Sequence, residues 1–443
     1  MTPRRRTLLL PALCVFAAAS LSVMPARAAV YVYSCILNPL QEVPPSTGSR
    51  GFGGGRFLID TGANTVTYWL VFSRLTGAEL SAHIHGSATS VPGVSAGVLT
   101  ALTPSGNPKI GVWNYAEADE ANILAGRCYA NIHSTSFPGG EIRGQIVPLN
   151  ATLDAAQETP VNASTGRGWA TFTVDTTANV LSYYVSYSGL TGAANGGHIH
   201  GAGLHGVLAG VLFTFPSLAS PMVGTWNYPQ ASEAALLSGR MYVNLHTVAN
   251  TGGEIRGQIC PIVVPMDCIQ ESPPNISLAS AGIALVAIDT LAKQLSYDVR
   301  IDTVTAVETL AHIHGFAPLG ASAGPLTPLA LGARKIGSWV YGAANEAGIL
   351  AGNTYFNTHT TNNPNGEIRG QILGLPQPPP LLSVGGGPRV LSGLAAAPNP
   401  FGVRTVLSFQ LARTGSVSMS IVGVDGRVVR HIPAALFAPG AHS

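Results

Sequence analysis

Nine of the 12 histidines recur in three sets with the same order and similar spacing. A His-Ile-His triplet occurs at His83–His85, His198–His200 and His312–His314. An Asn-x-His motif follows each triplet, at Asn131–His133, Asn244–His246 and Asn357–His359. Because imidazole binds transition metals and transfers protons near neutral pH, these nine residues are the first candidates for a functional site.

The spacing of the histidines indicates a shared face. In a strand, residues i and i+2 point the same way, so His83 and His85 project together while Ile84 faces the core. His133 joins them if its strand lies alongside. Three imidazoles suit zinc or copper with an open coordination position. The alternative is a polar cluster, in which the histidines hydrogen-bond to one another, to Asn131 or to a glutamate and only stabilise the fold. The same choice applies to the other two sets, which are His198, His200 and His246, and His312, His314 and His359.

A Gly-Glu-Ile-Arg-Gly-Gln motif ends each unit, at Gly140–Gln145, Gly253–Gln258 and Gly366–Gln371. Polar and apolar residues alternate in the second half of this motif, as in a strand with one exposed face. This alternation favours an exposed ladder of ion pairs between neighbouring strands. The functional alternative is that its glutamate orients a ligand histidine through the second ring nitrogen. The residues concerned are Glu141, Glu254 and Glu367. A Gln-Glu pair at the start of each unit supplies a further carboxylate that could reach the same site, at Glu42, Glu158 and Glu271.

Between these motifs the chain predicts short antiparallel strands. β-Branched and aromatic residues alternate over stretches such as 56–60 and 65–73, which flank a turn. One short helix is expected per unit, over 118–125, 231–238 and 344–351, each followed by a glycine. A unit of about 110 residues has the size of one β-sandwich domain. We therefore expect three independent, tandem antiparallel β-sandwiches of an immunoglobulin-like type joined by short linkers.

The first 28 residues predict an export signal. Three arginines precede an apolar stretch over 8–23, and Ala26-Arg27-Ala28 supplies a cleavage site after Ala28. The ordinary secretory route is favoured over a twin-arginine route. No later apolar run is long enough to span a bilayer. Removing four arginines from 23 basic residues leaves 19 against 21 acidic residues, which gives no basis for nucleic-acid binding. The mature protein is expected to be secreted or held at the cell surface.

Four cysteines remain in the mature chain: Cys35, Cys128, Cys260 and Cys268. An exported chain meets an oxidising compartment, so two disulfides with three connectivities can form. We favour Cys35–Cys128 and Cys260–Cys268. None of the four recurs in the other repeats, which argues for local cross-links rather than metal ligands.

No nucleophile motif or phosphate-binding glycine loop accompanies the histidines. The leading interpretation is therefore a non-enzymatic exported protein whose domains present loops to an extracellular protein or glycan, with histidines that are structural or hold a metal. The alternative is a secreted copper or zinc metalloenzyme, an oxidoreductase or hydrolase, with one site per repeat.

The repeated motifs resemble the CHRD domain family, named after chordin, a secreted antagonist of bone morphogenetic proteins. The shared features are Gln-Glu-x-Pro, Ala-His-Ile-His-Gly, Tyr-x-Asn-x-His and Gly-Glu-Ile-Arg-Gly-Gln. Repeat 2 departs with Gly197 before its first histidine, and repeat 3 with Asn365 in place of a glycine. The implied organisation is a leader over 1–28, CHRD repeats over 35–148, 150–262 and 264–374, a Pro/Gly-rich linker over 375–390 and a further module over 391–443.

The CHRD motifs in turn are similar to those of copper–zinc superoxide dismutases. This resemblance implies a dismutase-like sandwich and matches His83, His85 and His133 to three copper ligands. The chain departs in having no zinc-binding set between His85 and His133, and in carrying Glu141 where the dismutases have an arginine. Dismutase activity is therefore not expected.

The C-terminal segment resembles the start of the immunoglobulin-like FlgD or C-terminal sorting module of secreted bacterial proteins. Pro-Asn-Pro-Phe and Val-Asp-Gly-Arg-Val-Val-Arg carry the match. We expect a partial β module with strands over 405–411, 416–422 and 427–432, in one small sheet that lacks partner strands. The resemblance implies a bacterial protein that is either secreted or attached to the cell surface, in the second case through this module.

Overall fold

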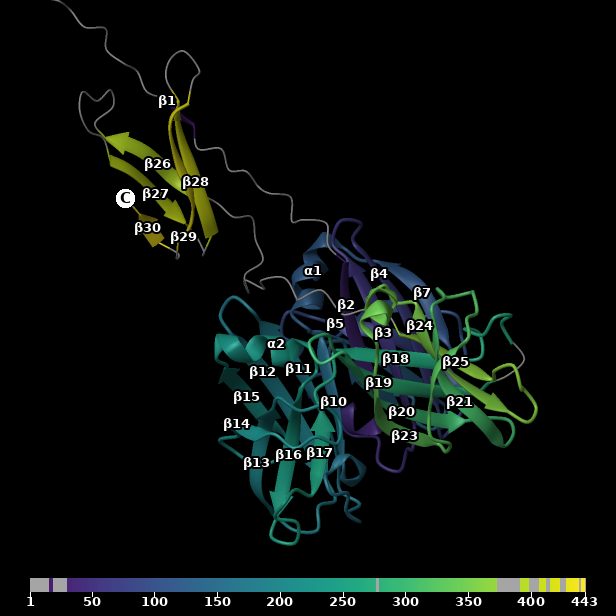
Figure 1. Cartoon of the computed structure of the whole chain (residues 1–443). Coiled ribbons are helices and arrows are strands. Elements are labelled where there is room, and N and C mark those ends of the chain that lie inside the picture. The colour runs from purple at the N-terminus through teal and green to yellow at the C-terminus, as the bar shows by residue number, and fades with distance from the viewer. Residues whose placement is uncertain are drawn as a thin grey trace, which may run out of the picture. The chain divides into compact units, whose positions relative to one another are not determined.

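The structure is a computed structural model that describes residues 30–275, 279–372 and 440–442, together with the course of the strands at 16–18 and between 391 and 437. The chain forms two compact units, Ala28–Leu382 and a second made of Met1–Arg27 with Ser383–Ser443. The first unit holds the three repeats (Figure 1). Among the described residues, no helix combines the length and hydropathy needed to cross a membrane.

Repeat 1 consists of two four-stranded antiparallel sheets, ordered β2-β3-β4-β7 and β6-β5-β8-β9. The sheets meet where β2 runs beside β9, through backbone bridges of Ser34 with Val147 and of Asn38 with Arg143. Its elements are β2 (Val30–Leu37), η1 (Pro39–Gln41), β3 (Phe52–Asp60), β4 (Thr65–Ser73), β5 (Glu79–Gly86), β6 (Val98–Ala101), β7 (Lys109–Asn114), α1 (Glu117–Leu124), β8 (Cys128–Ser134) and β9 (Ile142–Gln145).

Repeats 2 and 3 have the same strand order, and in each the strands form one continuous eight-stranded sheet. Repeat 2 is ordered β14-β13-β16-β17-β10-β11-β12-β15, and repeat 3 β22-β21-β24-β25-β18-β19-β20-β23. The elements of repeat 2 are β10 (Leu149–Asp154), η2 (Ala155–Gln157), β11 (Arg167–Asp175), β12 (Val180–Ser188), β13 (Ala194–Gly201), β14 (Gly210–Thr214), β15 (Met222–Asn227), η3 (Gln230–Ser232), α2 (Glu233–Leu237), β16 (Met241–Thr247) and β17 (Ile255–Gln258). Those of repeat 3 are β18 (Ile262–Asp267), β19 (Ala281–Asp289), β20 (Gln294–Thr303), β21 (Glu308–Gly315), β22 (Pro325–Pro328), β23 (Arg334–Val340), η4 (Ala343–Asn345), α3 (Glu346–Leu350), β24 (Thr354–Thr360) and β25 (Ile368–Ile372). The predicted all-β architecture with one strand order per repeat is confirmed.

The single short helix of each repeat is also confirmed. Helix α1 ends just before Gly126, whose φ of 68° lies in the left-handed region that glycine tolerates. Gly239 and Gly352 follow α2 and α3 with φ of 75°. Helices α2 and α3 are shorter than the sequence suggests, because the turns η3 and η4 occupy their expected first residues.

The three repeats keep their own strands but pack against one another, so they are not isolated domains joined only by short linkers. Ile36 and Val71 of repeat 1 share an apolar cluster with Val263, Ile283 and Leu285 of repeat 3. These side chains stand on sheet faces that point away from the core of their own repeat. An apolar face must be covered by another element, and here the neighbouring repeat covers it.

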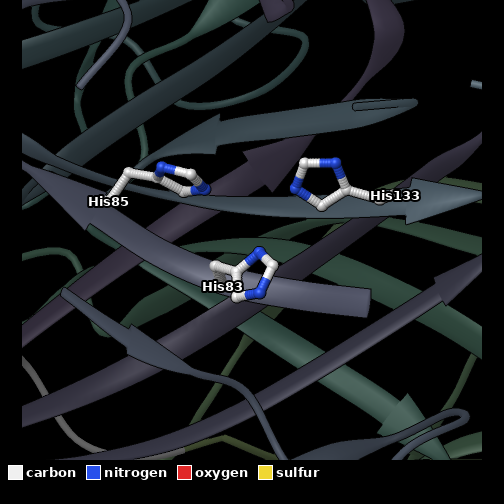
Figure 2. A group of neighbouring side chains, drawn as sticks. All are labelled: His83, His85 and His133. Atoms are coloured by element: carbon white, nitrogen blue, oxygen red, sulfur yellow. The ribbon is translucent and has the colours of Figure 1, made fainter. Parts of the chain in front are cut away.

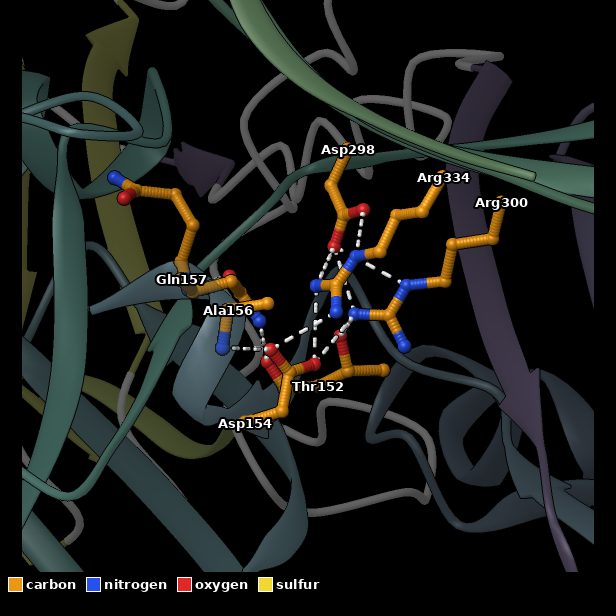
Figure 3. Close-up of polar contacts among 8 residues, drawn as sticks. Thr152, Asp154, Ala156, Gln157, Asp298, Arg300 and Arg334 are labelled. Carbon is orange, nitrogen blue, oxygen red and sulfur yellow. Dashed lines mark hydrogen bonds and ion pairs between the residues drawn. The ribbon is translucent and has the colours of Figure 1, made fainter. Parts of the chain in front are cut away.

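Polar contacts join repeats 2 and 3. Arg300 and Arg334 of repeat 3 lie between Asp298 of the same repeat and Asp154 of repeat 2 (Figure 3). Asp298 is fully buried. A buried carboxylate is tolerated only when paired and hydrogen-bonded, so this cluster fixes how the two repeats dock.

Each pair of repeats is joined by at least one polar contact. Asp154 precedes η2 of repeat 2 and meets β20 of repeat 3 through Arg300. Asp267, at the same position of repeat 3, meets β4 of repeat 1 through Trp69. Repeats 1 and 2 touch through Asn150, whose Nδ2 donates to the Ser34 carbonyl at 3.1 Å. The three repeats therefore form a closed ring in which each contacts both of the others.

The second unit contains two three-stranded sheets, ordered β1-β28-β29 and β26-β27-β30. Its strands are β1 (Phe16–Ala18), β26 (Leu391–Ala397), β27 (Val406–Leu411), β28 (Gly415–Val422), β29 (Val428–Phe437) and β30 (Gly440–His442). The three predicted strands correspond to β27, β28 and β29. They do not form one sheet, because β27 pairs with β26 and β30 whereas β28 pairs with β29 and β1.

Candidate metal centre

The strand register brings the three histidines of repeat 1 together. In the antiparallel pair of β5 and β8, Ser81 lies opposite His133, and His83 lies opposite Asn131. Ile84 and Ile132 point into the core, so the histidines stand on the outer face. One ring nitrogen of each of His83, His85 and His133 lies within 4.8 Å of the other two (Figure 2). The predicted convergence is thus present, and it recurs in the sets of repeats 2 and 3.

Backbone carbonyls fix the tautomers of two rings. His85 Nδ1 lies 2.9 Å from the Ala96 carbonyl, and His133 Nδ1 lies 2.9 Å from that of Pro138. A carbonyl only accepts, so each Nδ1 carries the proton and each Nε2 keeps a lone pair. Both Nε2 atoms, and Nδ1 of His83, are buried and have no hydrogen-bond partner. Repeat 1 therefore presents two fixed Nε2 lone pairs, and the unpaired Nδ1 of His83 lies beside them.

Repeats 2 and 3 reproduce this arrangement. His200 Nδ1 donates to the Ala209 carbonyl at 2.9 Å, and His246 Nδ1 to that of Thr251 at 3.0 Å. In repeat 3, His314 donates to Ala323 at 2.9 Å and His359 to Pro364 at 3.0 Å.

In repeats 2 and 3 the first histidine also comes close to the third. Nδ1 of His198 lies 3.2 Å from Nε2 of His246, and Nδ1 of His312 lies 3.5 Å from Nε2 of His359. A hydrogen bond between these rings is the structural alternative to a metal. It leaves Nε2 of His200 and of His314 buried without a partner. The alternative therefore accounts for two of the three nitrogens in each set.

The donor set fits a transition metal. Three neutral imidazole nitrogens suit copper or zinc, and neither a thiolate nor a carboxylate belongs to any of the three sets among the described residues. Burial, with the neighbouring His133, lowers the pKa of His83. Burial also lowers the pKa of His85, and the nearby Arg143 acts in the same direction. Both rings are consequently neutral at pH 7, which is the form that binds metal. His83 and His133 are only half-buried, which leaves one side of the set open.

The glutamates of the Gly-Glu-Ile-Arg motif are placed differently from the prediction. Glu141 is fully buried rather than exposed, and its Oε1 accepts from the Ser49 hydroxyl and the Thr76 amide. In repeat 2, burial opposes ionisation of Glu254, but hydrogen bonds from Ser164, Thr247 and Thr191 outweigh it and lower the pKa to about 2. Glu141, Glu254 and Glu367 accept hydrogen bonds from hydroxyls and backbone amides rather than from a histidine. A hydroxyl residue such as Thr247 directly follows the third histidine of each repeat. This recurrence is the sequence feature that could have predicted a hydrogen-bonded, buried carboxylate.

The glutamates at the start of each repeat contact the asparagine instead of the histidines. Asn131 Nδ2 donates to Glu42 Oε2 at 3.3 Å, and the same bond joins Asn244 to Glu158 and Asn357 to Glu271. Burial raises the pKa of Glu42 to about 7, although Arg143 acts in the opposite direction. These carboxyls are not part of the donor set.

Neither expected disulfide is present, since Cys35, Cys128 and Cys260 are buried thiols. The six-residue strand β18 separates Cys260 from Cys268. At about 3.3 Å per residue this strand spans roughly 20 Å, whereas bridged cysteines have Cα atoms about 4.4–6.8 Å apart. Cys35 and Cys128 lie on different sheets of repeat 1. Burial raises the pKa of Cys128 to about 12, which keeps this thiol protonated.

Curated relatives match part of the chain. Chordin from Xenopus laevis is 31% identical over 163 residues, a match that covers 31% of this chain and 17% of chordin. Chordin from Danio rerio is 27% identical over 164 residues, again over 31% of this chain and 17% of the relative. The aligned part is thus a small fraction of either chordin.

The family comparison covers far more of the molecule. The family model of the CHRD domain matches three segments, residues 33–146, 149–259 and 263–372. Each segment contains one complete set of strands and one histidine cluster. These three segments make up more than half of the chain, and the protein therefore belongs to the CHRD domain family, of which it carries three tandem copies.

Proposed function

We propose that each CHRD repeat binds one copper or zinc ion through its three histidines, and that the chain is an exported, non-enzymatic binding protein. The ligand atoms would be Nδ1 of the first histidine and Nε2 of the second and third. In repeat 1 these are His83, His85 and His133. The loops around the three repeats would present a surface to an extracellular protein or glycan, in line with the leader expected over residues 1–28 and with the chordin relatives.

One observation carries this proposal. Six ring N–H groups, two per repeat, donate to backbone carbonyls and thereby turn six Nε2 lone pairs towards three common points. Metal-binding histidines characteristically donate their second ring nitrogen to a carbonyl or carboxylate, because this fixes the ring and its tautomer. A polar cluster without metal leaves buried acceptors unpaired in every repeat, which costs about 1–3 kcal/mol for each buried group.

Metal analysis of the purified mature chain tests the proposal. After loading with Cu²⁺ or Zn²⁺ and removal of excess ion, we expect three metal equivalents per chain. His85→Gln should remove one equivalent and leave two. His205→Gln is the matched control, since His205 belongs to none of the three clusters. Retention of neither metal, or an equal loss in the control, would overturn the proposal.

Activity assays on the same metal-loaded protein distinguish the metalloenzyme alternative from the binding function. The half-buried edges of His83 and His133 leave one side of the set open to an exogenous ligand. A copper that cycles between oxidation states with added reductant and oxygen would favour an oxidoreductase. A bound ion without redox or hydrolytic turnover supports the binding function.

The cellular location needs its own test. We propose cleavage after Ala28 and a role of the C-terminal unit in attachment to the cell surface. The N-terminal residue of the mature protein, found by sequencing, tests the first point. Fractionation of cells that express the chain with and without residues 391–443 tests the second. An intact N-terminus would argue against the cleavage. An unchanged distribution between the cell fractions would argue against attachment through the C-terminal unit.

A further inference from the structure

Each histidine cluster packs on the tyrosine of the Tyr-x-Asn-x-His motif, a residue that has no role in the donor set described above. Tyr129 lies two residues before Asn131 on β8, and its ring stacks flat on His85, with centroids 4.9 Å apart and an interplanar angle of 2°. The pair of Tyr242 with His200 gives 4.9 Å and 3°, and that of Tyr355 with His314 gives 5.1 Å and 18°. The same contact therefore supports the second histidine of all three triplets.

A guanidinium closes the other face of each tyrosine. Arg143 Cζ lies 3.5 Å from the centroid of Tyr129, and the equivalent distances are 3.5 Å for Arg256 and 3.6 Å for Arg369. Arg143 is almost fully buried and donates to the Val94 carbonyl at 2.9 Å. The tyrosine ring thus lies between the imidazole on β5 and the guanidinium on β9.

The tyrosine hydroxyl reaches the loop that orients the same histidine. The Ala96 amide donates to Tyr129 Oη at 3.0 Å, while the Ala96 carbonyl accepts from His85 Nδ1 at 2.9 Å. In repeats 2 and 3 the amides of Ala209 and Ala323 donate to Tyr242 and Tyr355 at 3.1 and 2.9 Å. One tyrosine therefore fixes both the plane of the imidazole and the residue whose carbonyl selects its tautomer.

We infer that Tyr129, Tyr242 and Tyr355 are positioning residues of the three metal sites. Each aims Nε2 of the second histidine at the metal, and its arginine holds the tyrosine in place. The inference rests on the proposed function. A positioning role differs from simple packing in one respect. Packing needs only the aromatic ring, whereas positioning also needs the hydroxyl contact with the loop.

The test uses a full-length background in which only the site of repeat 1 is intact, made with His200→Gln and His314→Gln. Tyr129→Phe keeps the stack and removes the loop contact. Loss of such a supporting contact lowers metal affinity about 10-fold to 100-fold. Tyr129→Leu removes the stack as well and should lower affinity further. The electron paramagnetic resonance spectrum of bound Cu²⁺ should change in both variants, since one ligand ring is no longer fixed.

Tyr115→Phe is the matched control. Its hydroxyl is also buried in repeat 1 and donates to Glu120 at 2.9 Å, away from the histidines. This variant should lose stability without a change in copper affinity or spectrum. A Tyr129→Phe variant with the copper affinity and spectrum of the background would overturn the inference, even if Tyr129→Leu binds copper more weakly, because that result would show packing alone. The Phe variant alone decides the matter if the Leu variant does not fold. A background chain that binds no copper would instead refute the proposed function.

Discussion

The indole N–H of Trp69 in repeat 1 donates a 2.6 Å hydrogen bond to Asp267 Oδ2 in repeat 3. The two residues are far apart in the sequence, and their contact closes the ring of repeats. Asp267 is almost fully buried. Its other oxygen accepts from the amides of Ile269 and Gln270, so the carboxylate ties the first turn of repeat 3 to a strand of repeat 1.

Trp69→Phe should lower the free energy of unfolding by about 0.5–1.5 kcal/mol, because it removes one of the two hydrogen bonds to Asp267 Oδ2 and leaves the one from Gln270 Nε2. Denaturant unfolding measures the change. A double-mutant cycle with Asp267→Asn isolates the contact. A coupling energy near zero between the two substitutions would show that the hydrogen bond does not hold the repeats together.

Gly253 is required by its conformation and by its neighbours. Its φ is 133°, and a Cβ at this position would lie 2.6 Å from Glu158 Oε2. Gly253→Ala should therefore destabilise the protein by about 1–3 kcal/mol. The adjacent Gly252 is the matched control, since a Cβ there would meet nothing within 4 Å. Equal unfolding midpoints for the two alanine variants would contradict this prediction.

Glu254 should contribute stability that depends on pH. Its pKa is lowered from 4.5 to about 2, so the ionised carboxylate favours the folded state. The contribution is complete above about pH 4.5 and is lost as the pH falls towards about 2. The difference in unfolding free energy between the wild type and Glu254→Gln should shrink over that window. A difference that stays constant down to about pH 2 would rule out the ionised carboxylate as its source.

Metal should stabilise the ring if the three sites are occupied. At about 100 times the dissociation constant, a ligand that binds only the folded state adds about 2.7 kcal/mol per site. Zn²⁺ or Cu²⁺ should raise the thermal midpoint, and a chelator should reverse the change. His83→Gln, His198→Gln and His312→Gln should each remove part of the increase. An increase that survives all three substitutions together would place the metal elsewhere.

Much of the fold followed from local patterns. Alternation around Ile84 predicts that His83 and His85 share a face, and a glycine after each helix predicts its end. These signals depend only on neighbouring residues. The convergence of His133 with the triplet was also predictable, because the three motifs recur together.

The rest depends on contacts that no local pattern contains. Val71 and Ile283 alternate as strand residues do, but the sequence does not say that their outer faces meet between repeats 1 and 3. The alternation around Glu141 predicts an exposed ladder, whereas Ser49 and Thr76 contact this carboxylate and the residue is buried. The carbonyls of Ala96 and Pro138 orient two histidines and have no sequence signature, since any residue supplies a backbone carbonyl.

His205 is the histidine outside the repeat pattern whose surroundings the structure describes in full. Its Nδ1 lies 3.3 Å from the Ser296 hydroxyl of repeat 3, and Nε2 is buried without a partner. Burial lowers its pKa to about 4, against the attraction of Asp298 and together with the repulsion of Arg256, Arg334 and Arg300.

The low pKa of His205 makes the interface of repeats 2 and 3 sensitive to acid. The unfolded chain takes up a proton near the ordinary pKa of 6.5, whereas the folded chain resists protonation down to about 4. Stability is therefore complete above about pH 6.5 and falls as the pH drops through this window, by roughly 3 kcal/mol at about pH 4. His205→Phe fills the same space without titrating, so its unfolding free energy should fall less between these pH values. Parallel pH profiles for the wild type and the variant would show that His205 is not protonated on unfolding and that another group causes the acid sensitivity.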